Sequence, residues 1–134
     1  MSFEHVAMEL PNDRKVVFTA LSKHYFYFRM HISQFTLQQG AVPISAFMLF
    51  DYFMLDTVER DIVRSANNTL LKRSDELWVF GDISNGVLAE IKMAKSLNMP
   101  VKYFTIEKSQ RILPIDVGSV CLEEDVKQFA SELY

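Results

Sequence analysis

The stretch Asp75-Glu-Leu-Trp-Val-Phe-Gly-Asp-Ile-Ser-Asn-Gly-Val-Leu-Ala-Glu90 decides the fold of this chain. Its short apolar run, Leu77 to Phe80, is typical of a strand buried on both faces. A polar loop, Asp82 to Gly86, leads into a helix predicted over residues 86–98. Open α/β sheets bind ligands at such a junction, where a strand ends beside a helix N-terminus. Glu90 borders the apolar stripe of this helix, so a function has to explain its carboxylate.

Strand and helix patterns alternate on both sides of this stretch. The spacing is that of βαβ units, which predicts an α/β, flavodoxin- or Rossmann-like fold with about five mostly parallel strands and helices on both faces. We expect a single domain over residues 1–134, with a core at 15–106 and a C-terminal strand and helix in 107–134. The strands are predicted at Val16–Leu21, Ala41–Ser45, 77–80, Val101–Ile106 and within Ile115–Leu122.

Three further helices are predicted from apolar spacing, with the inward positions given below. The first should end at Gly40, which supplies a left-handed stop. The second should open at Asp56, in a capping-box pattern, and the third at the acids that begin with Glu123. The inward positions are Tyr25, Phe28, Ile32 and Phe35 in the first helix, Val58, Ile62, Ala66 and Leu70 in the second, and Val126, Phe129, Ala130 and Leu133 in the third.

Composition excludes several function classes. The net charge is −3 without a basic stripe, which argues against binding bulk nucleic acid. No run approaches the roughly 20 apolar residues of a membrane span. Cys121 is the single cysteine, which fits a reducing compartment, and the early acids Glu4 and Glu9 do not suit a signal peptide. We therefore expect a cytoplasmic protein. The three histidines show no metal-ligand spacing, so neither a metal nor a cofactor is expected.

The pattern Ser84-Asn-Gly86-Val-Leu-Ala-Glu90, in frame after the strand 77–80, resembles the nucleoside 2-deoxyribosyltransferase superfamily. That group includes deoxyribonucleoside 5′-monophosphate N-glycosidases, and the stretch 70–81 looks most like its uncharacterised short relatives. The resemblance implies a flavodoxin-like fold in which Glu90 attacks the anomeric carbon of a sugar. A helix N-terminus keeps a carboxylate ionised, which suits an oxocarbenium-like transition state. The alternative is a half-exposed helix residue.

The resemblance also implies the substrate class. Six residues before the glutamate, the base-exchanging transferases carry an acid that contacts the sugar, whereas the monophosphate glycosidases carry a serine that holds the 5′-phosphate. Here that residue is Ser84, and the amides of Asn85 and Gly86 could join it at the helix start. An ordinary helix cap would explain Ser84 as well. Lys23 stands where the glycosidases place an arginine. Thr19 is a further candidate in the first loop, and His24 and Tyr25 are alternatives there.

Three positions depart from the family pattern. The second acid of the family falls on Asn67, whose amide can form hydrogen bonds but cannot protonate a departing base. The tyrosine of the first strand is matched by Phe18, and the first loop lacks the usual glycines. Asp82 could serve as the acid, or it could be a turn residue facing solvent.

Two main hypotheses about the function follow from the sequence. The first is an N-glycosidase or deoxyribosyltransferase acting on a nucleoside 5′-monophosphate or a related small nucleotide. The second is a non-catalytic nucleotide-binding or sensing protein on the same scaffold. A third possibility is an interaction module that docks a partner through the aromatic segment 46–55. We also predict a homodimer or higher homo-oligomer, because residues 47–53 hold more large apolar side chains than a short connection can bury.

Overall fold

The computed structural model describes residues 1–50, 57–108 and 111–134. Five strands form one sheet in the order β2-β1-β3-β4-β5, and all neighbours are parallel except β4 and β5, which are antiparallel. The first four strands follow the flavodoxin-like order, as predicted. The bounds of the strands are Val16–Leu21 for β1, Val42–Ile44 for β2, Glu76–Phe80 for β3, Val101–Glu107 for β4 and Arg111–Ile115 for β5.

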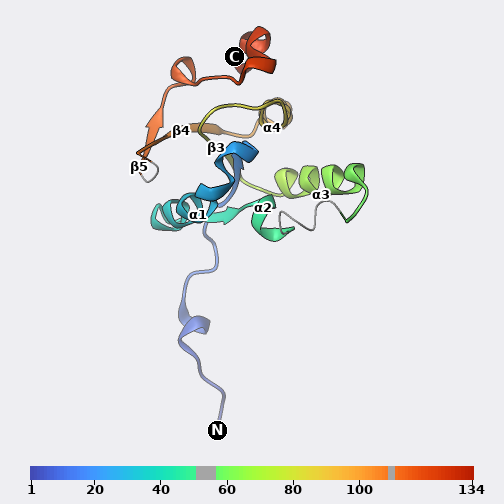
Figure 1. The fold of residues 1–134 in the computed structure, drawn as a ribbon. Helices are drawn as coiled ribbons and strands as arrows, with labels where there is room; N and C mark the ends of the chain where they lie inside the picture. The colour runs from blue at the N-terminus through green and yellow to red at the C-terminus, as the bar shows by residue number, and fades with distance from the viewer. Residues whose placement is uncertain (51–56, 109–110) are drawn as a thin grey trace.

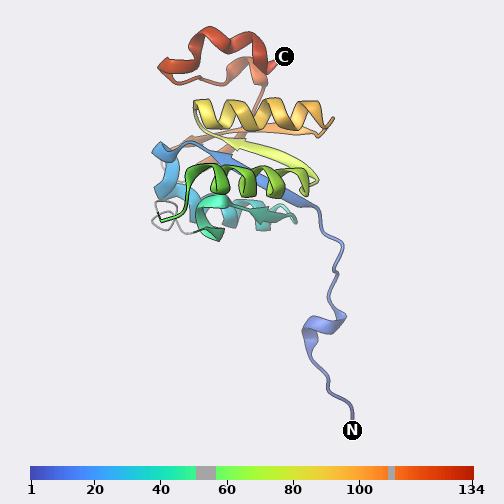
Figure 2. The same cartoon turned by 90° about the vertical axis from the view of Figure 1, so that its right-hand side faces the viewer.

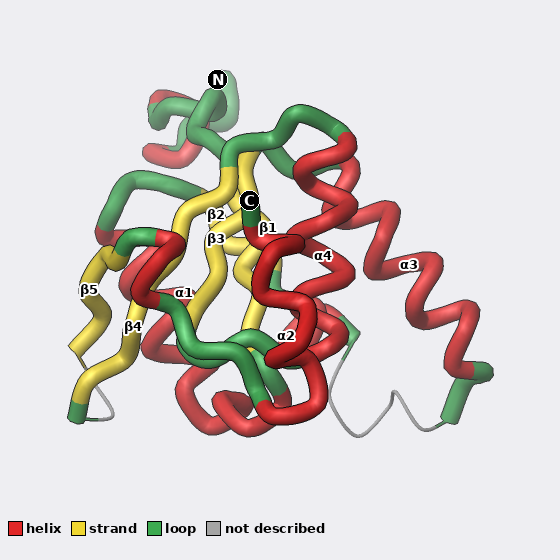
Figure 3. Tube along the Cα trace, turned by 90° about the horizontal axis from the view of Figure 1, so that it is seen from above, coloured by secondary structure: helices red, strands yellow, loops and turns green. Residues whose placement is uncertain are grey.

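Helices cover both faces of the sheet (Figures 1 and 2). The longer α-helices are α1, α3 and α4, and the 3-10 helices are labelled η. Helices α3 and α4 lie on one face, and α1 lies on the other (Figure 3). The bounds are Val6–Glu9 (η1), Lys23–Phe28 (η2), Arg29–Gln38 (α1), Ala46–Leu49 (α2), Arg60–Lys72 (α3), Asn85–Ser96 (α4), Val117–Ser119 (η4) and Glu124–Leu133 (η5).

The central strand β3 is buried on both faces, as its continuous apolar run predicts. Leu77 and Val79 pack with α3 and α4, while Trp78 and Phe80 pack with α1. Successive side chains of a strand point to opposite faces, so this one strand supplies both halves of the core. The sheet is therefore held firmly where β3 ends and the loop to α4 begins.

In the C-terminal third of the chain, the structure differs from two of the predictions. The last strand is not within 115–122 but is β5, and Leu122 makes only an isolated bridge to Ile83. Pro114 fits β5 because an edge strand has one side without a hydrogen-bonding neighbour. The final helix is a 3-10 helix with non-helical backbone at Phe129, so Phe129 and Ala130 are exposed instead of inward.

The helices before β3 also differ in detail from the prediction. The aromatic stripe that starts at Tyr25 is split between η2 and α1, although α1 ends before Gly40, whose φ of +83° gives the predicted left-handed stop. Asp56 lies outside the described residues, and α3 begins only at Arg60. Val58 is exposed and lies before α3 begins, and Ile62 is exposed because the face of α3 that turns inward is displaced from the predicted stripe.

Two segments bear on the oligomer prediction. Residues 1–15 are exposed, and the chain before Arg14, whose guanidinium donates to the Gly40 carbonyl, extends away from the sheet (Figure 2). The aromatic segment 47–53 lies only partly within the described residues, where Met48 and Leu49 are exposed. The homo-oligomer stays a prediction.

Candidate active site

An open cleft of about 1430 Å³ lies where the parallel strands end. Its walls come from the end of β1, from η2 and α2, from the facing sides of α3 and α4, and from the chain that follows Leu122. Figure 2 shows η2 and the first turns of α3 and α4 on the same side of the molecule. The residues that the sequence predicted for the site all line this cleft: Thr19, Lys23, Asn67, Asp82, Ser84, Asn85, Gly86 and Glu90.

Glu90 and Asn67 meet across the cleft. The Nδ2 of Asn67, on α3, donates a hydrogen bond of 2.7 Å to the Oε2 of Glu90, on α4. Glu90 is partly buried, and burial raises the pKa of its carboxyl to about 7, against the opposing effect of the Asn67 hydrogen bond. Contrary to the prediction from the sequence, the helix N-terminus therefore does not keep this carboxylate fully ionised, and near neutral pH the group is balanced between its acid and its nucleophilic form. Its side chain is also held in place by a residue from another helix.

This pKa has a consequence for stability. The carboxyl titrates near 4.5 in the unfolded chain and near 7 in the folded protein, so the folded state binds more protons between these values and loses stability as the pH rises through them. Glu90→Gln removes that loss and keeps an acceptor for Asn67. We expect the variant to exceed wild type by about 1–2 kcal/mol in free energy of unfolding at pH 8, below the limit of about 3 kcal/mol that a full shift would give.

Denaturant unfolding at pH 4.5 and pH 8 measures this difference. The two proteins should differ little in stability at the lower pH, where Glu90 is protonated in the folded protein and half protonated in the unfolded chain, so that ionisation contributes less than about 0.5 kcal/mol. A variant that is less stable than wild type at pH 8 would show that the ionised carboxylate stabilises the fold. Asn67→Ala is the matched control, because it leaves the carboxylate in place and should lower stability at the higher pH.

The N-terminus of α4 opens into the same cleft. Ser84 is its N-cap, and its Oγ accepts a hydrogen bond of 3.3 Å from the amide of Val87. The hydroxyl proton of Ser84 stays available to a ligand. In the part of the chain that the structure describes, the amides of Asn85 and Gly86 donate to no protein group. A Cβ on Gly86 would meet nothing within 4 Å, so a ligand has room beside these donors. This is the arrangement that receives anions at helix starts.

The two candidates on the first loop differ in what they offer. Thr19 is buried, and its hydroxyl donates its proton to the carbonyl of Ile44 at 3.2 Å. The hydroxyl therefore has no proton to donate to a phosphate. Lys23 is exposed at the start of η2, and its charge lowers the pKa of nearby Glu123. An ammonium on a flexible side chain at the rim can reach an anion in the cleft. Of the two, Lys23 suits phosphate contact.

Asp82 lines the cleft next to Gly81 and interacts with Tyr25. Gly81 has a φ of +79°, and a Cβ at this position would lie 2.6 Å from the Tyr25 ring. Burial raises the pKa of the Tyr25 hydroxyl, with a smaller opposite effect from a hydrogen bond of the Asp82 backbone. Asp82 itself is exposed and makes no hydrogen bond to Glu90 among the described residues. Gly81 therefore makes room for the Tyr25 ring, which lines the cleft.

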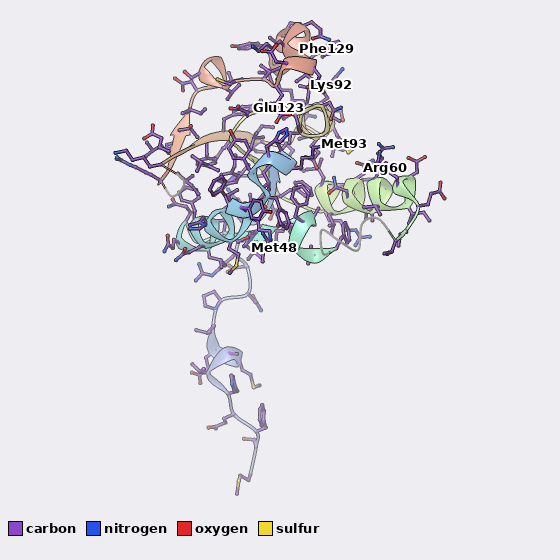
Figure 4. All side chains as sticks on the ribbon, in the orientation of Figure 1. Met48, Arg60, Lys92, Met93, Glu123 and Phe129 are labelled. Atoms are coloured by element: carbon purple, nitrogen blue, oxygen red, sulfur yellow. The ribbon has the colours of Figure 1, made fainter. Side chains whose placement is uncertain are left out.

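The sequence did not predict a polar cluster that ties the first loop to the C-terminal segment. Ser22 Oγ donates to Glu123 Oε2 at 2.6 Å, and His24 Nδ1 lies 3.0 Å from the same oxygen. Burial alone would raise the pKa of Glu123, but the hydrogen bonds from Ser22 and His24 outweigh it and lower the pKa. Figure 4 labels Glu123 on the chain that crosses above η2. This cluster fixes one rim of the cleft.

Two arginines of α3, Arg60 and Arg64, also line the cleft and were not predicted. Their spacing from Asn67 places them on one helical face with it, and that signal is present in the sequence. Within the described residues, no group of three or more histidine, cysteine, aspartate or glutamate side chains is arranged to hold a metal ion. The same residues include no helix that is both long and apolar enough to cross a membrane.

Comparison with known proteins places the chain in a family. No curated protein matches the sequence. A family model, described as a domain of unknown function, DUF7768, matches residues 21–104. The match begins at the end of β1 and runs into β4, and it contains every predicted site residue except Thr19. Because the matched region is more than half of the chain, the protein belongs to the DUF7768 family.

Proposed function

We propose that this protein is an N-glycosidase or deoxyribosyltransferase that acts on a nucleoside 5′-monophosphate or a related nucleotide, with Glu90 as nucleophile. The observation that carries the proposal is the placement of a held carboxylate and an open helix N-terminus in one cleft. Six residues separate Ser84 from Glu90, or about 9 Å along the helix axis. That is the length scale of a sugar phosphate with its phosphate at Ser84 and its anomeric carbon at Glu90.

The reaction would follow from this placement. The ionised carboxylate of Glu90 attacks the anomeric carbon, and the C–N bond breaks with its electron pair going to the base. Asn67 keeps the attacking oxygen in position. Water or a second base then displaces Glu90 from the glycosyl ester, which completes hydrolysis or exchange. The resemblance of residues 84–90 to the nucleoside 2-deoxyribosyltransferase superfamily supports the same roles for Ser84 and Glu90.

A second candidate is a nucleotide-binding or sensing protein that does not cleave its ligand. One observation favours it: the hydrogen-bond partner of Glu90 is an amide, and an amide cannot supply a proton to a leaving base. The same phosphate contacts would then serve binding alone.

The deciding experiment is a panel of purine and pyrimidine nucleoside monophosphates, in the ribo and deoxy series, incubated with the wild-type protein. Released base is separated and quantified, and thermal unfolding is followed with each nucleotide. Base release supports the enzyme. A rise in melting temperature without released base supports the binding protein. A panel that produces neither result would refute both candidates.

A further inference from the structure

One face of α3 lines the cleft, and it has an unusual composition. The residues of α3 on the cleft are Arg60, Val63, Arg64, Asn67 and Asn68, which recur at the spacing of a single helical face. The face therefore carries two guanidinium groups and two amides, and no carboxylate. Figure 4 shows Arg60 on α3, which lies next to the α4 helix that carries Met93. This wall lies beside the helix that holds Glu90, and Asn67 contacts Glu90 directly.

The charges of the cleft are separated in space. Arg64 Nη1 contacts Asp61 Oδ1 at 3.0 Å, and both side chains are largely exposed. Among the described residues Arg60 forms no ion pair. Apart from Glu90, the carboxylates that line the cleft come from the loop after β3 and from the C-terminal segment: Asp82, Glu123, Glu124 and Asp125. The α3 wall is thus the cationic side of the cleft.

This arrangement bears on the leaving group. The 5′-phosphate is placed at the start of α4 and the anomeric carbon at Glu90, so the base has to lie toward the remaining walls, which α3 and the aromatic residues Phe47 and Phe50 provide. A base that departs as a neutral molecule needs a proton in the transition state. Asn67 cannot give one, and Asp82, the other candidate acid, comes from the loop after β3 and not from the α3 wall. A guanidinium can instead stabilise negative charge that develops on the base.

Resting on the proposed function, we propose that the substrate carries an acidic, lactam-type base of the uracil class, which departs as an anion held by Arg64 and, farther out, by Arg60. The bond that forms joins a Glu90 oxygen to the anomeric carbon, and the bond that breaks is the C–N bond, whose electron pair stays on the base. Water later adds to the anomeric carbon and frees Glu90. The proton that this water loses neutralises the base anion, so the reaction needs no other reactant.

Arg64 is then a specificity-determining residue with a distinct kinetic effect. The base is uncharged in the bound substrate and negative only as it leaves, so the guanidinium should act on kcat and leave KM nearly unchanged. Arg64 is three residues from Asn67, about 4.5 Å along the axis, and Arg60 is about 10 Å away. The loss of Arg64 should therefore have the larger effect.

The test compares kcat/KM for 2′-deoxynucleoside 5′-monophosphates of 5-fluorouracil, uracil, thymine and cytosine. The first three bases depart as anions with decreasing ease, and cytosine needs a proton. Wild type should follow that order. Arg64→Gln should lower kcat for the uracil series by roughly 10- to 100-fold, the effect of one charged hydrogen bond. Arg64→Lys should recover part of the loss, and Arg60→Gln should lose less.

The matched control is Arg73→Gln, at the C-cap of the same helix and away from the cleft. Its activity should equal that of wild type. The side chain of Arg64 is 65% exposed, so the variant should fold, which thermal unfolding checks. A faster reaction with cytosine, or an Arg64→Gln variant equal to Arg73→Gln, would overturn the inference while the N-glycosidase stands. If wild type releases no base from any nucleotide, the proposed function fails and this inference with it.

Discussion

Glu90→Gln is expected to reduce base release from a nucleoside monophosphate by at least about three orders of magnitude. An amide oxygen is a poor nucleophile, and losing a covalent step removes a large part of the rate acceleration. The replacement has nearly the same shape and keeps an acceptor for the Asn67 amide, so the cleft should keep its form. Nucleotide affinity should accordingly change by less than about tenfold.

Quantified base release under single-turnover conditions, together with equilibrium binding of the same nucleotide, measures both effects. Lys92→Gln is a suitable control because Lys92 lies on the same helix, is exposed, and pairs with Glu132 away from the cleft. A Glu90→Gln protein that releases base at the wild-type rate would remove Glu90 from the mechanism. Equal loss of affinity and rate would assign the residue to binding instead of chemistry.

The wild-type pH profile gives an independent view of the same group. Because the nucleophile must be ionised and the pKa of Glu90 is raised to about 7, the rate should rise with pH through that value and then level off. Asn67→Ala removes the hydrogen bond that opposes the effect of burial. In that variant the midpoint should move to higher pH.

The sequence predicted the sheet well because its strongest signal is local. A continuous apolar run such as Leu77–Phe80 has to be covered on both sides, and this alone makes β3 central. The parallel neighbours follow from the alternation of strands with helices. The antiparallel β5 was missed because a short edge strand with Pro114 carries little periodicity. The exposure of Phe129 was missed because a 3-10 helix does not repeat at 3.6 residues.

In the candidate site, too, the local relations between residues could be predicted and the long-range contacts could not. Ser84 and Glu90 lie on one helix, so their relation could be derived from spacing alone. The contact between Asn67 and Glu90 spans 23 residues, and the resemblance indicated only that position 67 belongs to the site. The contact between Ser22 and Glu123 spans 101 residues, and no local pattern could have predicted it. Arg60 and Arg64 could have been predicted as site residues from the sequence, since they share a helical face with Asn67.

Ser84→Asp is expected to weaken the binding of a nucleoside monophosphate by roughly a hundredfold or more, while the binding of the matching nucleoside changes little. Two like charges about 4 Å apart repel by about 4 kcal/mol at the effective dielectric constant of a protein surface. Aspartate caps helices as well as serine does, so the hydrogen bond from the Val87 amide should persist and the fold should keep its stability. The variant therefore changes charge without removing the cap.

Binding is best measured in a Glu90→Gln background, which prevents turnover, by calorimetry with the monophosphate and with the nucleoside. Ser84→Ala is the matched variant: it should cost about 1 kcal/mol in stability through the lost cap but weaken phosphate binding only modestly, because the amides of Asn85 and Gly86 stay in place. If Ser84→Asp bound both ligands as wild type does, the phosphate would have to lie away from the start of α4. Lys23 would then be the first alternative to test, since it reaches the cleft from the opposite loop.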